Sequence, residues 1–305
     1  MRDRAQARPS GSARPVRARS VLDDARPGAP VIMAVVNRTT DSFYESAATL
    51  DGALAAVDAA AEAGARIVDI GGVRAGRGRE ISVAEEIDRV APAVTAVRER
   101  HPGLLISVDT WRAEVAEAVC AAGAGLLNDT WAGADPRVAE VAAAFDVGLV
   151  CSHTGGLTPR TDAHRSRYGL HAGEVVTDTV AGVVALAEAA QRAGVAPERI
   201  VIDPTPDFGK NTYHSLRLLR ELTRFRDTGY PVLLAISRKD FIGETIGAAG
   251  PADRLHGTIA ATALAVERGA AVIRAHDVAA TADAIAVTVA ITGEAQPRHT
   301  VRGLR

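Results

Sequence analysis

The sequence predicts an α/β fold, a (β/α)8 TIM barrel in which eight strands alternate with eight helices. Short runs rich in Val, Ile and Leu alternate with Ala-rich stretches of helical periodicity along the whole chain. The short runs are apolar throughout, as parallel strands covered on both faces are. Together the repeated units occupy residues 31–293, close to the roughly 250 residues of such a barrel. A doubly wound open sheet is the structural alternative, but no Gly-rich dinucleotide turn follows the first run.

The predicted elements follow one another in a regular order. The strands are expected at residues 31–36, 66–70, 104–108, 125–127, 148–151, 199–202, 232–236 and 271–273. The helices are expected near residues 51–63, 83–100, 112–122, 135–145, 172–193, 212–227, 253–268 and 279–291. Several predicted helices run into a glycine, such as Gly123 and Gly269, at the position where a left-handed residue ends a helix.

The two ends of the chain differ from the repeat. Residues 1–29 contain seven Arg and three Pro with almost no aliphatic periodicity, so they are predicted to be a disordered basic arm. Residues 30–293 are predicted to form one barrel domain, and residues 294–305 a flexible tail. Acidic residues Asp3, Asp23 and Asp24 argue against an organellar transit peptide, and the start lacks a secretory apolar core. We therefore expect a cytoplasmic protein.

Composition narrows the classes of function. The chain has a formal net charge of -2, 47% hydrophobic and 24% charged residues, which is typical of a globular protein and gives no reason to expect nucleic acid as a partner. No apolar run approaches the roughly 18 residues of a membrane helix, so no membrane partner is expected either. Cys120 and Cys151 lack metal-ligand or redox spacing and are expected to be buried thiols.

Every predicted strand is followed by polar or ionisable residues. In chain order the strand ends carry Asn37; Asp69 to Gly72; Asp109 and Thr110; Asn128 and Asp129; His153; Asp203; Ser237 to Lys239; and Arg274 to Asp277. A lone Asp or Asn there would usually be a solvated loop residue or a helix N-cap. In a barrel, however, the carboxyl ends of all strands meet at one rim, which is where active sites lie. The whole set therefore predicts a polar site at that rim.

The rim residues divide by chemistry. Asp109, Asn128 and Asp203 can accept hydrogen bonds from the N–H groups of a heterocycle. Asn37, Arg274 and His276 belong to the first and last strands, which are neighbours in a closed barrel, and suit phosphate oxygens. Lys239 stands between the two groups, with a solvated surface lysine as the alternative.

Metal and covalent chemistry receive little support. None of the eight His residues has zinc-ligand spacing, and no nucleophile with a base is suggested by the sequence order. Mg²⁺ needs only one or two protein oxygens beside ligand phosphates, and Asn37 can supply one.

These motifs together resemble dihydropteroate synthase. They are Asn37-Arg-Thr-Thr-Asp-Ser-Phe43, Val108-Asp109-Thr110, Asn128-Asp129, Asp203-Pro204 with Phe208-Gly209-Lys210, Ser237-Arg238-Lys239 and Arg274-x-His276-Asp277, in order over almost the whole barrel. The resemblance implies a transferase of folate biosynthesis that condenses 6-hydroxymethyl-7,8-dihydropterin diphosphate with p-aminobenzoate in the presence of Mg²⁺. It also implies a homodimer, since barrels of this kind commonly pair through outer helices.

The resemblance assigns roles by position. The pterin would be bound by Asp109, Asn128, Asp203 and Lys239, and the diphosphate would be bound by Asn37, Arg274 and His276. The second substrate would contact Phe208 and Lys239, and the metal would bind Asn37. The catalytic residues would be Asp109 and Lys239.

The chain also departs from the family pattern in its loops. After Gly71-Gly72-Val73 it has Arg74-Ala75-Gly76-Arg77 in place of the usual Ser-Thr-Arg-Pro, and Ser152-His153-Thr154 replaces Met-His-Met. Two added acids, Asp207 and Asp240, fall near the expected site of an acidic second substrate, which they should repel.

These departures leave more than one function open. The chain is either an active synthase or a divergent homologue that binds a pterin or another phosphorylated heterocycle without this activity. A pterin-dependent methyl carrier is a more distant alternative, and a non-enzymatic interaction role would depend on the basic arm alone.

Overall fold

Eight parallel strands form the centre of the molecule. The computed structural model describes residues 21–38, 49–163, 165 and 168–302. The strands are β1 (Val31–Asn37), β2 (Ile67–Gly71), β3 (Leu105–Asp109), β4 (Leu126–Asp129), β5 (Gly148–Ser152), β6 (Ile200–Asp203), β7 (Leu233–Ala235) and β8 (Val272–Ala275). They pair in the order β6-β5-β4-β3-β2-β1-β8-β7, and a parallel bridge between Ile202 and Val232 joins β6 to β7. The sheet is thereby closed, and the predicted barrel is confirmed.

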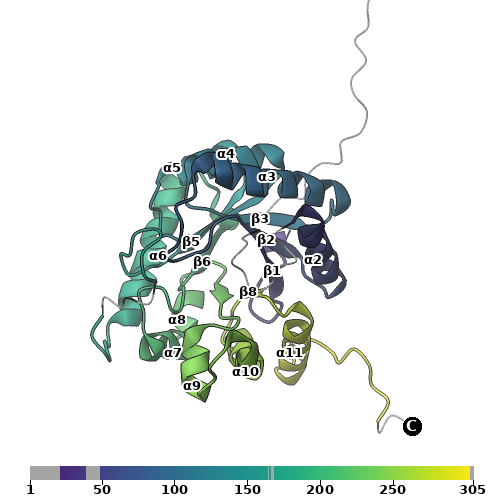
Figure 1. The fold of residues 1–305 in the computed structure, drawn as a ribbon. Coiled ribbons are helices and arrows are strands. Elements are labelled where there is room, and N and C mark those ends of the chain that lie inside the picture. The colour runs from purple at the N-terminus through teal and green to yellow at the C-terminus, as the bar shows by residue number, and fades with distance from the viewer. Residues whose placement is uncertain (1–20, 39–48, 164, 166–167, 303–305) are drawn as a thin grey trace, which may run out of the picture.

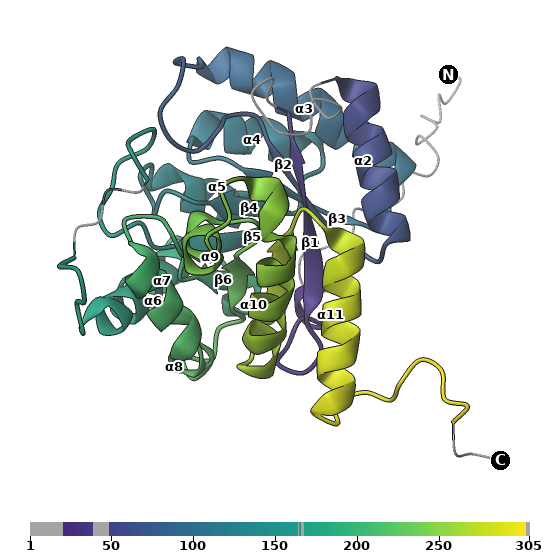
Figure 2. The ribbon, with the colours of Figure 1, turned by 60° about the horizontal axis from the view of Figure 1, so that its bottom comes forward.

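The helices lie outside the strands, as Figures 1 and 2 show from two directions. They are α2 (Leu50–Glu62), α3 (Val83–Arg100), α4 (Ala113–Ala122), α5 (Arg137–Ala144), α6 (Val175–Arg192), α7 (Thr212–Arg220), α8 (Thr223–Arg226), α9 (Asp240–Ile246), α10 (Leu255–Glu267) and α11 (Val278–Ile291). In the described part of the chain, none of these helices is long and apolar enough to cross a membrane.

Alternation along each strand separates two hydrophobic cores. Ile67, Leu126 and Val150 belong to the core inside the barrel. Their next neighbours in sequence, such as Leu127 and Cys151, belong to the layer between strands and helices. Because side chains alternate with a period of two, the next residue but one on each strand again faces inward. This rule decides which residues at the strand ends face the barrel axis.

Residues 21–29 do not behave as part of a disordered arm. Val21, Leu22 and Ala25 are only 1%, 3% and 4% exposed, and they pack with Met33 in the core inside the barrel. Asp24 also forms an ion pair with Arg66 at 2.8 Å. The Arg-rich composition concealed three apolar side chains that cover the amino-terminal end of the strands. Residues 1–20 lie outside the described residues.

Three helical predictions need correction. The helix expected at 212–227 is divided into α7 and α8, and the one expected at 253–268 begins with a 3-10 turn, Pro251–Arg254, before α10. Helix α9 was not predicted; it begins directly after Lys239, where no helix was expected. Only seven residues long and containing Gly243, it lacks the periodicity that identifies longer helices.

Candidate functional site

The polar residues at the strand ends face the barrel axis. Strand alternation, counted from the residues of the core inside the barrel, gives the polar side chains that face inward. They are Asp69, Ser107, Asn128, Ser152, Asp203 and Arg274. The same count, continued by two or more residues, reaches Asn37, Asp109 and His276. The strand registers place Asn37 beside Gly71, Gly71 beside Asp109, and Asp109 beside Asn128. The structure therefore brings the predicted ring-binding residues together at one end of the barrel.

Asp69 connects three of these residues, although the sequence predicted it only as one of the polar strand-end residues and assigned it no role of its own. Its carboxylate accepts hydrogen bonds from the Ser107 hydroxyl at 2.6 Å, from Nδ2 of Asn128 at 3.0 Å and from Nε of Arg274 at 2.7 Å. The Asp69 side chain is fully buried. A buried carboxylate needs such partners, because an unpaired charge in the interior is costly. Asp69 thus fixes both the amide of Asn128 and the guanidinium of Arg274.

Asp109 lies above Asp69 and shares Arg274 with it. Nη2 of Arg274 approaches Oδ2 of Asp109 at 3.4 Å, and the Thr130 hydroxyl donates to Oδ1 at 3.1 Å. Burial and the neighbouring Asp69 carboxylate raise the pKa of Asp109 to about 7. Burial likewise raises the pKa of Asp203. The site therefore holds several acceptors near one another, with Arg274 as the compensating charge.

The expected phosphate-binding group is only partly assembled. Arg274 was expected beside Asn37 and His276 as a phosphate ligand, but its guanidinium pairs with the carboxylates of Asp69 and Asp109. His276 forms hydrogen bonds to the Ser237 hydroxyl from its backbone N–H at 3.2 Å and through Nδ1 at 3.1 Å. Burial and the charge of Arg274 lower the pKa of His276 to about 4, so the ring is neutral at pH 7.

Asn37 ends β1 at the rim. Its Oδ1 lies 3.5 Å from where a Cβ on Gly71 would stand, so the glycine leaves space for this amide. The motif that follows Asn37 falls in residues 39–48, which lie outside the described residues. In the described part of the chain, no group of three or more His, Cys, Asp or Glu side chains is arranged to hold a metal ion.

Lys239 and Phe208, which follow β7 and β6, lie against each other. The Lys239 ammonium donates to the carbonyl of Pro206 and stands 4.9 Å from the centre of the Phe208 ring. The Phe208 ring packs edge-on against Trp131 at 5.5 Å, and Trp131 against Trp111 at 6.4 Å. Burial lowers the pKa of Lys239. Lys239 is thus a half-buried residue of the site, and its interpretation as a solvated surface lysine is wrong.

The two added acids do not face the site as free charges. Oδ2 of Asp207 accepts hydrogen bonds from the backbone N–H groups of Asp240 at 2.8 Å and Phe241 at 3.3 Å, at the start of α9. Its Oδ1 accepts one from the Ser215 hydroxyl at 3.2 Å. Asp240 pairs with Arg254 at 2.5 Å. The expectation that both acids repel a ligand directly is therefore corrected, because each has an internal partner.

Lys210 is a second lysine next to this region, and the sequence assigned it no role of its own. Its ammonium is almost fully buried and donates to the carbonyls of His153 at 2.8 Å, Thr205 at 3.2 Å and Phe208 at 2.9 Å. Three carbonyls match the three N–H donors of an ammonium group. Lys210 thereby joins the loops after β5 and β6. A signal was present: Lys210 and Lys239 are the only lysines in the chain, which uses arginine everywhere else.

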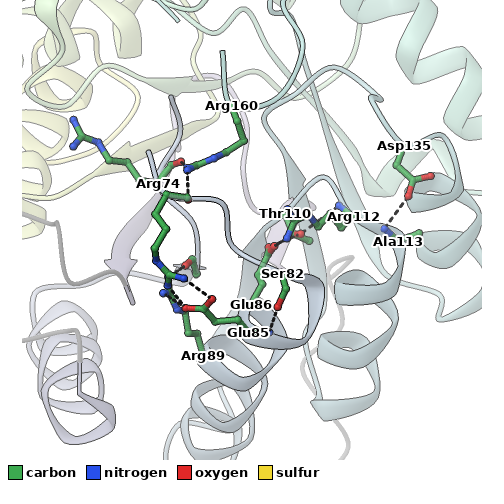
Figure 3. Close-up of polar contacts among 12 residues, drawn as sticks. Arg74, Ser82, Glu85, Glu86, Arg89, Thr110, Arg112, Ala113, Asp135 and Arg160 are labelled. Carbon is green, nitrogen blue, oxygen red and sulfur yellow. Dashed lines mark hydrogen bonds and ion pairs between the residues drawn. The ribbon is translucent and has the colours of Figure 1, made fainter. Parts of the chain in front are cut away.

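Arginines anchor the unusual loop after β2. Figure 3 shows Arg160, from the loop after β5, reaching the backbone of Arg74; it donates to the Arg74 carbonyl at 2.5 Å and to that of Arg79 at 2.7 Å. Arg89 donates to the Gly72 carbonyl at 2.8 Å. The loops after β2 and β5 are therefore held to each other across the rim.

Glu86 supports the same region from below. This fully buried carboxylate accepts hydrogen bonds from the Thr110 hydroxyl at 2.8 Å and from Arg112 at 2.9 Å, the first of which is visible in Figure 3. Arg112 also lies 4.9 Å from the centre of the Trp111 ring. The segment after β3 is thus tied to α3.

Comparisons with known proteins agree with this geometry. The family model described as pterin binding enzyme matches residues 33–276. "Inactive dihydropteroate synthase 2" of Mycobacterium tuberculosis is 52% identical over 276 residues, which cover 90% of this chain and 86% of that protein. The dihydropteroate synthase of Neisseria meningitidis is 37% identical over 271 residues, covering 86% and 93%. The structure of Xanthomonas albilineans dihydropteroate synthase with 4-aminobenzoic acid is 37% identical, with a TM-score of 0.78, and the match covers 86% of this chain and 93% of that one.

Proposed function

This chain belongs to the pterin binding enzyme family as a dihydropteroate synthase homologue, and we propose that it binds a pterin diphosphate without the synthase activity of its active relatives. The relative named inactive is 52% identical to this chain, whereas the relative named synthase is 37% identical. The ligands in question are small molecules: two structures of the Xanthomonas albilineans synthase contain 7,8-dihydropteroate and 4-aminobenzoic acid.

The floor of the site supports pterin binding. Asp109, Asn128 and Asp203 present acceptors from β3, β4 and β6 toward the barrel axis. Lys239 adds a donor at the rim, where it also flanks the Phe208 ring. A flat heterocycle with several N–H groups and an exocyclic oxo group matches this set of donors and acceptors.

The diphosphate would lie toward Asn37, Arg274 and His276. Nε of Arg274 can keep its hydrogen bond to Asp69 while the longer contact of Nη2 with Asp109, at 3.4 Å, gives way to a phosphate oxygen. Mg²⁺ fits here as an ion bound chiefly through the ligand, because Asn37 supplies one amide oxygen. When bound, it would neutralise charge on the diphosphate.

The observation that carries the loss of activity is the Asp207 carboxylate. It accepts hydrogen bonds from the backbone N–H groups of Asp240 and Phe241, which directly follow Lys239 in the sequence. Lys239 and Phe208 are the two residues that the resemblance assigns to the second substrate. The two backbone N–H groups that follow Lys239 are thus occupied by the protein's own carboxylate and are not free to bind the carboxylate of an arylamine.

Two measurements test this function. Calorimetry with 6-hydroxymethyl-7,8-dihydropterin diphosphate and Mg²⁺ should show saturable binding. Diphosphate release after addition of p-aminobenzoate should stay at background under conditions in which an active family member turns over. Turnover at the rate of an active member would contradict the proposed loss and favour the synthase, with Asp109 stabilising the cationic pterin methylene. Absence of pterin binding would remove the proposed function altogether.

We further propose that the protein is a homodimer through α10 and α11. Leu264 on α10 and Val287 and Ile291 on α11 are 51%, 59% and 80% exposed, and the last two lie one helical turn apart. Exposed aliphatic residues grouped on neighbouring helices are typical of an interface. Light scattering should give a dimer for the wild type and a monomer for V287D/I291D, while L170D, at a 64% exposed leucine elsewhere, should leave the mass unchanged. The cytoplasmic location and the absence of a nucleic-acid partner stay predictions from the sequence.

A further inference from the structure

Two buried polar atoms inside the barrel have no hydrogen-bond partner within the part of the chain that the structure describes. They are Oδ1 of Asn128 and the hydroxyl of Ser152. Asn128 is 1% exposed and Ser152 is fully buried. A buried polar atom without a partner costs free energy, so such atoms are rare in native proteins and need an explanation.

Both atoms belong to side chains that face the barrel axis. On β5, Val150 lies in the core inside the barrel and Cys151 in the outer layer, so Ser152 faces inward again. On β4, Leu126 and Leu127 show the same alternation and place Asn128 inward. The strand register sets Ser152 beside Asp203 of β6. The two unpartnered atoms and the Asp203 carboxyl therefore line one side of the site.

Several other buried hydroxyls in the described part of the chain do have partners. The neighbouring inward-facing Ser107 donates to Asp69 at 2.6 Å, and Thr262 in α10 donates to the carbonyl of Thr258 at 2.8 Å. Ser152 has neither a carboxylate nor a carbonyl in reach among the described residues. Its hydroxyl is thus not explained by the packing of the barrel.

We propose that Ser152 is a specificity-determining residue of the ring site, whose hydroxyl donates a hydrogen bond to an acceptor atom of the bound heterocycle. This inference rests on the proposed pterin-binding function. The direction of the bond is inferred from the neighbours: Asn128 donates from Nδ2 to Asp69 and offers its unpartnered Oδ1 as an acceptor, and the carboxyl of Asp203 already accepts from the backbone N–H of Thr205 at 2.7 Å. Ser152 supplies the donor on this side.

The ligand edge that fits is one in which donors and an acceptor alternate. The 2-amino-4-oxo pyrimidine ring of a pterin has N–H groups for Asn128 and Asp203 and an oxygen or ring nitrogen for Ser152. A ring with an apolar edge at this position would leave the Ser152 hydroxyl desolvated and unpaired, which a site of this kind rejects strongly. Ser152 therefore selects for a ligand with a polar ring edge. A larger apolar residue at this position would only pack against the ring.

The test compares two ligands on four proteins by calorimetry. The ligands are 6-hydroxymethylpterin and inorganic diphosphate; the proteins are the wild type, S152A, S152C and T281A. Thr281 is a matched control, because its hydroxyl is also buried without a partner but lies on α11, outside the barrel. S152A and S152C should bind the pterin about 3- to 10-fold more weakly than the wild type. Diphosphate binding should be unchanged in all four proteins, and T281A should bind the pterin normally.

The outcomes separate this inference from the proposed function. If the wild type binds no pterin, the proposed function fails and this inference fails with it. If the wild type binds the pterin and S152A binds it equally well, the inference fails alone. If S152A weakens both ligands together with a lower unfolding temperature, Ser152 has only a structural role and the inference is likewise overturned.

Discussion

Nε of Arg274 donates a hydrogen bond to Oδ2 of Asp69 at 2.7 Å, and this carboxylate is fully buried inside the barrel. The D69N variant would lose the charge that Arg274 needs and would turn an amide N–H₂ toward the donors of Asn128 or Ser107. Removing one partner of a buried pair costs about 3–5 kcal/mol. We therefore expect the free energy of unfolding, measured in urea, to fall by about that amount.

The control is D88N, at an exposed aspartate of α3. It should change the free energy of unfolding by less than about 0.5 kcal/mol. A D69N protein as stable as the wild type would show that Arg274 does not depend on Asp69.

Asp109 should give the protein a distinct dependence of stability on pH. Its pKa in the folded chain is about 7, above the ordinary value near 4. Between these two pH values the folded state binds more protons than the unfolded state, so stability falls as pH rises from about 4 to about 7 and then levels off. D109N lacks this contribution. Urea unfolding at half-unit pH steps should show wild-type stability falling relative to D109N across that window.

The comparison with D109N removes opposing contributions that both proteins share, such as that of His276, whose pKa is lowered to about 4. If the two stability profiles run parallel from pH 4 to pH 7, the raised pKa of Asp109 is refuted.

Asp207 holds the start of α9 from a left-handed backbone position. Its φ is +70°, and its carboxylate serves Asp240, Phe241 and Ser215. D207A would lose these bonds and keep the strained φ, whereas D207G would lose the bonds but relieve the strain, which is about 1 kcal/mol. Asn tolerates this region and can still accept a bond. We expect stability in urea to decrease in the order wild type, D207N, D207G, D207A.

If D207A is as stable as D207G, the left-handed φ is not a constraint on this loop. If both equal the wild type, the Asp207 carboxylate does not stabilise α9.

The barrel itself could be predicted because its strands are uniformly apolar and its helices Ala-rich, which are local properties of the sequence. The residues at strand ends could be predicted from the same pattern. Asp69 was among them, but its role could not be predicted, because that role arises from hydrogen bonds with Asn128 and Arg274, which are 59 and 205 positions away. The sequence shows which residues reach the rim, but not which of them pair with one another.

The loops illustrate a second limit. The added carboxylate of Asp207 was visible in the sequence, but its orientation depends on α9, a helix too short to predict. Lys210 could have been identified, because lysine occurs only twice in a chain with 35 Lys and Arg residues in total. Arginine cannot replace a fully buried ammonium group that matches three carbonyls, since its donors form a planar fork.

Leu22 should be essential to the stability of the barrel. It is 3% exposed and packs with Val31 and Met33 at the amino-terminal end of the strands. L22A would leave a cavity there and should lower the free energy of unfolding by about 2–5 kcal/mol. The control L170A, at a leucine that is 64% exposed, should have almost no effect. Equal stability of both variants in urea would mean that residues 21–29 do not cover the barrel.

Lys210 provides a prediction at alkaline pH. Burial lowers its pKa to about 7, whereas an unfolded lysine titrates near 10.4. Between these values the unfolded state binds more protons, so stability should rise with pH from about 7 to about 10 relative to K210M, in which this contribution is absent.

At pH 7, K210M should also be less stable than the wild type by about 2–3 kcal/mol, because the carbonyls of His153, Thr205 and Phe208 lose their donor. Urea unfolding of both proteins at pH 7, 8, 9 and 10 measures the difference. A constant difference over this range would show that the buried ammonium keeps its ordinary pKa, and its three carbonyls would then compensate fully for burial.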